Sequence, residues 1–444
     1  MSETTRQDIL LEQLRAENLD QVRSMLGELH PSEIADLLES LPGKERKQLW
    51  ELVNPEVDGD VLSEMQDAVR AGFLEQMEPQ EVAEVTQDLD TDDVADILQD
   101  LPEEVADTVL HSMDEQNRER IASLMSYPED TAGGMMNTDV VSVRADVSLD
   151  VVSRYLQQRG ELPENTNSLM VVDRENRYLG ILSLADLLVN KAERSVGETM
   201  TETAAIGADS PSQEVAKLFE QRDLISAAVI DGENKLLGRI TVDDVVDVIQ
   251  EEAEHTVLSM AGLGDDDTFA SVLTSGKRRV VWLGINLLTA FFASWVIGRF
   301  EGTIQQLVAL AILMPIVASM GGIAGNQTLT IAIRALALGQ LNKTSSRQLI
   351  LKEIAVGLLN GGVWAVVVGA VAWLWFGDQG LALIIGLAMM INLLIAAVSG
   401  ACIPLLLRRL GIDPAIAGGV ILTTITDVVG FMTFLGLATL FLFP

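Results

Sequence analysis

One acidic residue, Asp427, lies inside an apolar run from Ala415 to Phe443 that holds no basic residue. A lone carboxylate deep in a bilayer costs roughly 3 kcal/mol or more unless it meets water, a cation or a bonding partner. Thr423 precedes Asp427 by four residues, so a hydroxyl and a carboxylate share one face of the predicted helix. The pattern predicts a membrane helix that lines an ion path, and the alternative is a buried hydrogen bond between two helices.

A second set of oxygens is expected in the earlier run MGGIAGNQTLT, where Asn326 and Gln327 place amide groups at depth. The alternative is that the glycines serve packing and the amides bond to neighbouring backbone. Carboxylate, amide and hydroxyl oxygens suit a hard cation such as Mg²⁺, Ca²⁺ or Mn²⁺. One carboxylate per chain is few for a divalent ion, and a homodimer with Asp427 near its two-fold axis would supply two.

The charge of the chain is divided unevenly along its length. The formal net charge is -35, yet the part from Ser271 onward carries 10 basic and 5 acidic residues, so the acidic excess lies in the first 270 residues. A body this acidic repels nucleic acid and attracts cations, which excludes nucleic acid as a partner; general solubility is the alternative explanation. The single cysteine, Cys402, lies in an apolar run and leaves no disulfide within the chain.

Five apolar segments after Ser271 are each long enough to cross a hydrocarbon core of about 30 Å. They cover residues 280–298, 304–325, 349–376, 380–407 and 414–443, so a lipid bilayer is the expected surrounding. Basic residues gather before the first segment, between the second and third, and between the fourth and fifth. By the positive-inside rule the N-terminus is cytoplasmic and the C-terminus outside. The first residues, MSETTRQDIL, show no signal pattern.

The acidic part divides into two regions. Residues 1–136 show helical periodicity with a weak twelve-residue repeat from Met77, Leu89 and Leu101, which predicts short helices in a superhelical solenoid. Residues 137–195 and 196–250 are two copies of one strand, turn, strand and helix unit, matched at an offset of 58 residues. This duplication resembles a tandem cystathionine-β-synthase (CBS) pair. A charged helix predicted at Val245–Gly262 lies in a connecting segment, 245–270, before the membrane part, 277–444.

Taken together these parts resemble the bacterial MgtE magnesium channels over nearly the whole chain. The resemblance rests on YPEDTAGGMM at Tyr127, the CBS pair, GRITVDDVVDVIQEEAE at Gly238, the GNQ of the second apolar segment and TTITDVVG in the fifth. The fold class expected is therefore a multidomain protein with a short-helix N domain, an α/β CBS pair and five transmembrane helices. Ile323, Gly419 and Val420 depart from the family pattern, so the polar pore wall is expected to be thinner here.

The resemblance implies a homodimeric channel of the bacterial inner membrane that is selective for Mg²⁺ and is closed by intracellular Mg²⁺. The expected pore residues are Asp427, Asn326, Thr423, Gln327 and Gly419. The expected regulatory ligands are Asp92, Asp96, Asp243, Asp244, Asp247, Glu251 and Glu252. The helix at Val245–Gly262 matches the plug helix of the family. Independently of the resemblance, clustered carboxylates repel one another, and divalent ions that bridge them would let the acidic bodies close.

A nucleotide is a further possible ligand, because CBS pairs commonly bind adenine nucleotides. Thr241 precedes Asp244 by three residues, and Ser183 precedes Asp186 by the same spacing, which is similar to the ribose-contacting pattern for ATP. The alternative is a helix N-cap without a ligand. Two other functions stay open: a channel for Mn²⁺ or Co²⁺, and a membrane-tethered metal or nucleotide sensor without transport. An enzyme is not expected, because the three histidines are scattered and no nucleophile elbow or P-loop occurs.

Overall fold

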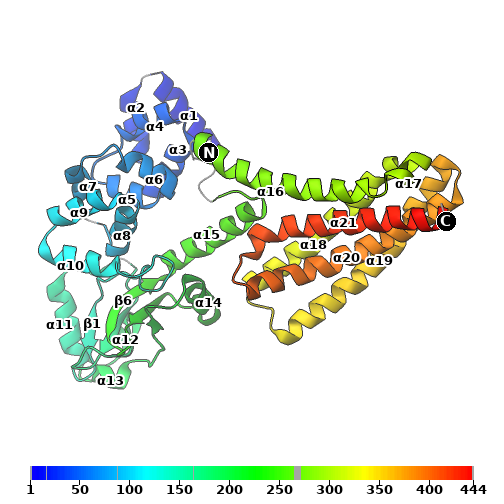
Figure 1. Cartoon of the computed structure of the whole chain (residues 1–444). Helices are drawn as coiled ribbons and strands as arrows, with labels where there is room; N and C mark the ends of the chain where they lie inside the picture. The colour runs from blue at the N-terminus through cyan, green and yellow to red at the C-terminus, as the bar shows by residue number, and fades with distance from the viewer. Residues whose placement is uncertain (1–2, 17, 88, 164, 265–271, 443–444) are drawn as a thin grey trace. The chain divides into compact units, whose positions relative to one another are not determined.

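The computed structural model describes residues 3–442 except 17, 88, 164 and 265–271. It divides into two compact units, Met1–Glu252 and Ala253–Pro444 (Figure 1). The first unit contains the predicted helical N domain and the CBS pair, and the second contains the apolar segments. Residues 265–270 of the predicted connecting segment lie outside the described residues.

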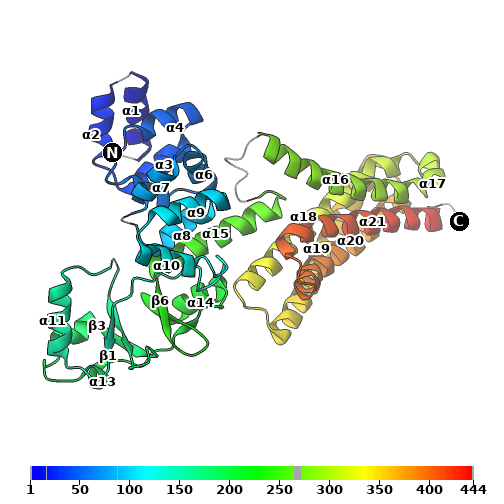
Figure 2. The same cartoon turned by 60° about the vertical axis from the view of Figure 1, so that its left-hand side comes forward.

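Short helices build the N-terminal part, as Figure 2 shows. They are α1 (Glu3–Arg15), α2 (Leu19–Leu26), α3 (Pro31–Ser40), α4 (Gly43–Trp50), α5 (Asp58–Ser63), α6 (Asp67–Leu74), α7 (Pro79–Val85), α8 (Thr91–Gln99), α9 (Glu103–Ser112) and α10 (Glu115–Leu124). The last five of these begin twelve residues apart, so the repeat extends beyond the three copies read in the sequence. Each helix buries one apolar stripe, with Leu38, Leu62 and Leu98 fully covered.

Two three-stranded sheets repeat one topology in the CBS pair. The first has the order β1 (Ser142–Arg144), β2 (Ser168–Val172), β3 (Tyr178–Ser183), and the second β4 (Ile206–Gly207), β5 (Ser226–Ile230), β6 (Leu236–Thr241). In both, the first strand runs parallel to the middle strand and the third runs antiparallel. The flanking helices are α11 (Leu149–Arg159), α12 (Leu184–Val189), α13 (Val196–Thr199), α14 (Ser212–Arg222) and α15 (Val242–Met260).

The two copies join through equivalent hairpins. Asn176 and Asn234 stand at the same place in each turn with φ of 61° and 65°, a left-handed conformation that asparagine tolerates. Tyr178 N–H donates to the Asn234 carbonyl, and Leu236 N–H donates to the Asn176 carbonyl. This reciprocal bonding follows the 58-residue offset and confirms the predicted duplication.

Five helices of the second unit are long and apolar enough to cross a membrane. They are α16 (Val272–Gly298), α18 (Ala309–Ala337), α19 (Lys343–Phe376), α20 (Gln379–Arg409) and α21 (Pro414–Leu442). Helix α20 is the most buried, and it packs against α18, α19 and α21. The predicted number of spans is confirmed within the described residues.

The predicted start of the second span, residue 304, is wrong. Residues 304–306 belong to a separate short helix, α17 (Glu301–Gln306), and Leu307 then adopts an extended conformation that ends it. The hydroxyls of Thr303 in α17 and Thr439 in α21 are 2.8 Å apart, which fixes α17 against the end of α21. The sequence itself marks this division, because Gln305 and Gln306 at the end of α17 are polar and the continuous apolar run begins only at Leu307.

Candidate functional site

The carboxylate of Asp427 lies on α21 with part of its surface exposed and no hydrogen bond or ion pair to any described residue. The alternative of a bond between helices is therefore absent from the described part of the chain. Thr423, one turn earlier, is exposed, and its hydroxyl donates 2.9 Å to the carbonyl of Gly419. That hydroxyl still has a lone pair to offer, so the exposed face of α21 presents oxygen atoms and no positive charge.

Helix α18 lies antiparallel to α21 at close range. A Cβ atom at Gly325 would lie 2.9 Å from Leu422 Cδ1, and one at Gly418 would lie 3.0 Å from Leu329 Cδ1. These reciprocal contacts set the level of the two helices, because each leucine occupies the space over the other helix's glycine. Leu422 is the residue before Thr423 and Gly325 is the residue before Asn326, so the two polar residues lie near one level.

Asn326 and Gln327 of α18 are both exposed on the surface of the second unit. No hydrogen bond from either amide occurs within the part of the chain that the structure describes. From the contact of Gly325 with Leu422, Asn326 lies six residues from the level of Asp427, or about 9 Å along the helices. This separation of the backbones suits an ion that keeps its water shell, because Mg²⁺ binds direct ligands at about 2.1 Å.

Four polar residues in the membrane part were missed by the sequence analysis. Glu353 of α19 and Asn392 of α20 are buried, and Thr328 of α18 donates a 3.0 Å hydrogen bond to the Glu353 carboxylate. Asp413 accepts from the N–H of Ala415 at 2.8 Å and caps α21, and it lies 3.5 Å from the His255 ring. Glu353 could have been noticed as an acid within the third apolar segment.

An acidic surface in the first unit forms where α8 and the first half of α15 contribute carboxylates. Burial raises the pKa of Asp92, and the charge of Asp244 raises it further. Burial likewise raises the pKa of Asp244 to about 6. The pKa of Asp96 is raised to about 7 by burial, although Arg70 opposes this shift. The raised pKa values show that the charged forms of these carboxylates are unfavourable at this surface. A bound cation would offset that cost.

The lower part of α15 extends the same acidic surface. The pKa of Glu251 is raised by burial first and then by Asp67 and Asp247. Arg70 lies among these acids, and its guanidinium donates to Asp100 at 2.6 Å and to Asp67 at 2.8 Å. Among the described residues, Arg70 is the basic side chain that lies among these acids, so they outnumber the basic charge at this surface.

The sequence analysis missed two members of the acidic surface. Burial raises the pKa of Asp93 to about 7, and it also raises the pKa of Glu129. Asp93 adjoins Asp92 in the sequence and could have been included, whereas Glu129 is brought in only by the fold.

Two of the predicted regulatory residues are engaged elsewhere. Asp243 accepts hydrogen bonds from Asn165 Nδ2 at 2.5 Å and from the hydroxyl of Thr241. Glu252 accepts from Gln213 Nε2 at 2.8 Å. Helical geometry explains the difference, because successive residues of α15 point in directions about 100° apart and only one face meets α8.

The acidic surface is not a finished metal site in this conformation. Among the described residues no group of three or more His, Cys, Asp or Glu side chains is arranged to hold a metal ion. One oxygen fits such a role, because Asp92 Oδ1 is buried and has no hydrogen-bonding partner in the described part of the chain. The carboxylate set suits a hard divalent cation, and its members would have to move closer together to share one.

The two predicted nucleotide pairs form helix caps. The Asp186 N–H donates to Ser183 Oγ at 2.9 Å, which caps α12. The Thr241 N–H donates to Asp244 Oδ2 at 2.9 Å at the start of α15. The capping alternative is therefore present at both positions, and a bound nucleotide would have to share these side chains.

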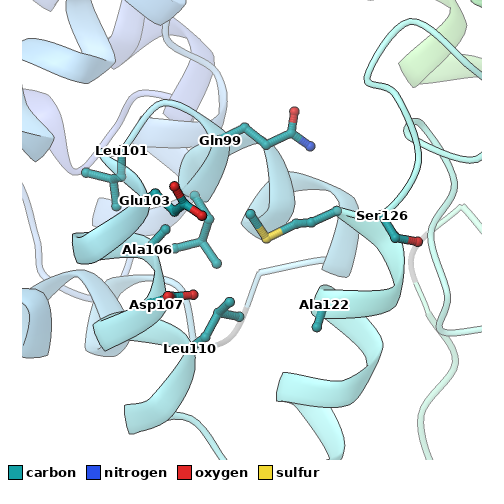
Figure 3. A pocket seen from close by; sticks show the side chains of 10 residues that line it. Gln99, Leu101, Glu103, Ala106, Asp107, Leu110, Ala122 and Ser126 are labelled. Carbon is teal, nitrogen blue, oxygen red and sulfur yellow. The ribbon is translucent and has the colours of Figure 1, made fainter.

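A hollow of about 410 Å³ lies between α8, α9 and α10 in the N domain (Figure 3). Apolar side chains such as Leu101, Leu110 and Met125 line it, with Glu103 and Asp107 at its edge. None of the predicted pore, regulatory or nucleotide residues lines this hollow, so it is separate from the candidate site.

Three family models match successive parts of the chain. The MgtE intracellular N domain matches residues 29–130, the CBS domain matches 132–193 and 196–251, and MgtE, described as a divalent cation transporter, matches 314–437. The magnesium transporter MgtE of Bacillus subtilis is 31% identical over 97% of this chain and 96% of its own length. The chain belongs to the MgtE family. The MgtE of Enterococcus faecalis is 33% identical over 98% of this chain and 96% of its own.

A solved structure supports the same assignment for the first unit of this MgtE-family chain. The crystal structure of the cytosolic domain of the Mg²⁺ channel MgtE in complex with ATP has a TM-score of 0.50 and 32% identity. It covers 54% of this chain and 98% of its own length. The predicted family and fold class are confirmed, and the MgtE-family chain is a multi-pass membrane protein.

Proposed function

We propose that this MgtE-family chain forms a homodimeric, Mg²⁺-selective channel of the bacterial inner membrane that intracellular Mg²⁺ closes. The observation that carries the proposal is Asp427, an acid within a membrane helix that has no bonding partner in the described part of the chain. Such a group needs water or a cation to offset its charge. The printed names of the relatives, magnesium transporters, support Mg²⁺ as the ion.

The ion passes Asp427 with its water shell largely in place. Mg²⁺ dehydrates reluctantly and is often held through its waters by one or two carboxylates. Asn326 and Thr423 lie about 9 Å and 6 Å from the level of Asp427 along the helices, so they act on the ion in succession with it. Carboxylate, hydroxyl and amide oxygens accept hydrogen bonds from the coordinated waters, and Gln327 and the Gly419 carbonyl add acceptors to the same path.

A second copy of the chain completes the path. The exposed polar side chains of Asn326, Gln327 and Thr423 would be costly against lipid, whereas a water-filled space between two copies would accommodate them. A two-fold axis near α18 and α21 places two Asp427 carboxylates on one path. The basic residues between the spans support a cytoplasmic N-terminus and a C-terminus outside, by the positive-inside rule.

Closure follows from the acidic surface of the first unit. The charge of Asp244 on α15 raises the pKa of Asp92 on α8, which shows that the two carboxylates repel. Asp96, Asp247 and Glu251 belong to the same acidic surface and add to the repulsion while no divalent cation is shared. Neutralisation by intracellular Mg²⁺ lets these elements approach. Helix α15 begins in the first unit and ends in the second, so it links the acidic surface to the membrane unit as a plug helix would. Asp243 adds to the repulsion while it is bonded to Asn165, because its charge raises the pKa of Asp244 and that of Asp247. Glu252 is bonded to Gln213 and contributes less.

The decisive test is Mg²⁺ uptake into proteoliposomes by the Asp427→Asn variant. Asparagine keeps the size of the side chain and removes the charge, so uptake is expected to fall at least about tenfold, the change that 1.4 kcal/mol of lost ion stabilisation produces. Glu301→Gln is the matched control, because it removes an exposed acid of α17 and should leave uptake unchanged. Uptake by Asp427→Asn at the rate of the parent would remove Asp427 from the mechanism.

The same assay separates the alternatives. Competition by Mn²⁺ or Co²⁺ at equal concentration tests whether the path prefers another divalent ion. A chain that binds Mg²⁺ but moves none in either direction would be a membrane-tethered sensor. ATP is proposed as a ligand of the CBS pair because the related cytosolic domain was crystallised with it. Ser183, Asp186, Thr241 and Asp244 are the residues proposed to contact it.

A further inference from the structure

Two buried polar side chains that the proposed ion path does not use lie on either side of the glycine-rich part of α18. Glu353 of α19 has 3% of its surface exposed, and Asn392 of α20 has none. A buried polar group is costly among apolar helices unless it is bonded. An ionisable residue within a membrane span also calls for a functional explanation.

Glu353 holds one end of this segment. Thr328, itself 4% exposed, donates its hydroxyl to Glu353 Oε2 at 3.0 Å, and the Lys352 amine lies 3.4 Å from Oε1. In the part of the chain that the structure describes, the bond between Thr328 and Glu353 is the one side-chain hydrogen bond that joins α18 to α19. Thr328 follows Asn326 by two residues, a rotation of about 200°, so the bond grips the side of α18 opposite Asn326.

Asn392 holds the other end. Its Nδ2 donates to the Val317 carbonyl at 2.8 Å. A Cβ atom at Gly321 would collide with this amide, and one at Gly430 of α21 would lie 2.9 Å from Nδ2. Asn392 therefore fills the space between α18 and α21, at a level one helical turn beyond Asp427.

The segment between these two bonds packs through its glycines. Gly321 lies against Asn392 and Gly325 against Leu422, so side chains of the neighbouring helices enter α18 here, while α18 itself projects none at these two positions. Glycine is also among the weakest helix formers, so this stretch can twist or unwind at low cost. A small rotation about the helix axis would carry Asn326 away from the path.

We propose that Glu353 and Asn392 are positioning residues, which act through Thr328 and the Val317 carbonyl as a two-ended polar clamp on α18. The clamp sets the rotation of the glycine-rich segment and thereby presents Asn326 to the ion. The consequence for ion passage rests on the proposed function. The clamp itself is a property of the helix packing and can be measured without transport.

The test is hydrogen exchange of the full-length protein in detergent, followed by mass spectrometry of peptides within residues 318–330. Glu353→Ala and Thr328→Val each remove one partner of the bond, and Asn392→Leu removes the donor at nearly constant size. Each is expected to speed exchange in this segment about tenfold. Glu353→Gln keeps an acceptor oxygen for Thr328 and should stay within twofold of the parent. The double variant Glu353→Ala with Thr328→Val should exceed neither single variant.

Peptides from residues 360–372 of α19 are the internal control for folding and should keep the exchange rate of the parent. Unchanged exchange at residues 318–330 in the alanine and valine variants would overturn the clamp, whatever their uptake. Glutamine behaving as alanine would also overturn it, because the charge and not the hydrogen bond would then matter. In proteoliposomes the alanine variant should lose about tenfold in preference for Mg²⁺ over Co²⁺, and glutamine should restore it. Faster exchange together with full uptake by Asp427→Asn would refute the proposed function and leave the clamp standing.

Discussion

We expect the first unit to be stabilised either by protons or by Mg²⁺, because both neutralise its buried carboxylates. Burial raises the pKa of Asp93 and that of Asp96 to about 7 from an ordinary value of 3.8. Between these two values the folded chain binds more protons than the unfolded chain. The free energy of unfolding therefore falls as the pH rises through this window, and the loss is complete above the folded pKa.

The size of the effect follows from the width of the window. One pKa unit corresponds to about 1.4 kcal/mol, and pH 5 lies two units below the folded value. Asp93 and Asp96 should each therefore remove about 2.5 kcal/mol of stability between pH 5 and pH 8. Domains of this size unfold with about 5–15 kcal/mol, so the loss is a large fraction of the total.

Urea unfolding of a soluble fragment that ends at Gly262 measures this directly. In the absence of divalent ions the midpoint should be higher at pH 5 than at pH 8. Saturating Mg²⁺ should raise the midpoint at pH 8 and change it little at pH 5, where the carboxylates already carry protons. The Asp93→Asn, Asp96→Asn double variant should lose most of the pH dependence, whereas Asp209→Asn, which removes an exposed acid, should keep it. A fragment that is equally stable at both pH values, or that Mg²⁺ stabilises equally at both, would refute the reasoning.

Further predictions concern regulation and the CBS pair. Neutralisation of Asp244, Asp247, Glu251 and Glu252 together should leave channel currents insensitive to millimolar internal Mg²⁺, because the repulsion that Mg²⁺ relieves is gone; full inhibition in that variant would contradict the sensor assignment. Glu252→Gln alone should behave as the parent in the same recording, since Glu252 bonds Gln213 and lies outside the acidic surface. Thr241→Ala should weaken ATP binding at least about fivefold through loss of one hydroxyl contact worth about 1 kcal/mol, as measured by calorimetry; unchanged affinity would indicate that the residue serves only as part of the helix cap.

Features that repeat along the chain could be predicted from the sequence. The twelve-residue period places a helix start at Pro79, Thr91 and Glu103, and the 58-residue offset places Asn176 and Asn234 at matching turns. Such features depend on residues close in sequence, whose spacing is visible directly. Five apolar runs likewise predicted five long helices, although the start of the second span was placed within the short polar helix α17.

Contacts between distant residues could be predicted only as lists of candidates. The run VDDVVDVIQEE of α15 offered five acids to the acidic surface, and packing sent Asp243 toward Asn165 and Glu252 toward Gln213. Glu129 joined that surface through the fold alone. The face that α15 turns to α8 is decided by which apolar residues it buries, and its charged pattern does not specify that face.

Glu353 shows why the membrane part was harder to predict. Lys352 and Glu353 are adjacent and of opposite charge at the start of a long span, a pattern typical of residues at a membrane surface. Packing buries only one of them, since the Lys352 side chain is 64% exposed and that of Glu353 only 4%, although the two form an ion pair at 3.4 Å. Thr328 accounts for the difference, because a buried hydroxyl on α18 offers the carboxylate a bond that compensates for part of its lost hydration. With a hydrophobic residue at position 328, the Glu353 carboxylate would have no hydrogen-bond donor on α18 and would be expected to point to the surface. The hydrogen bond to Thr328 therefore accounts both for the clamp and for the burial of Glu353.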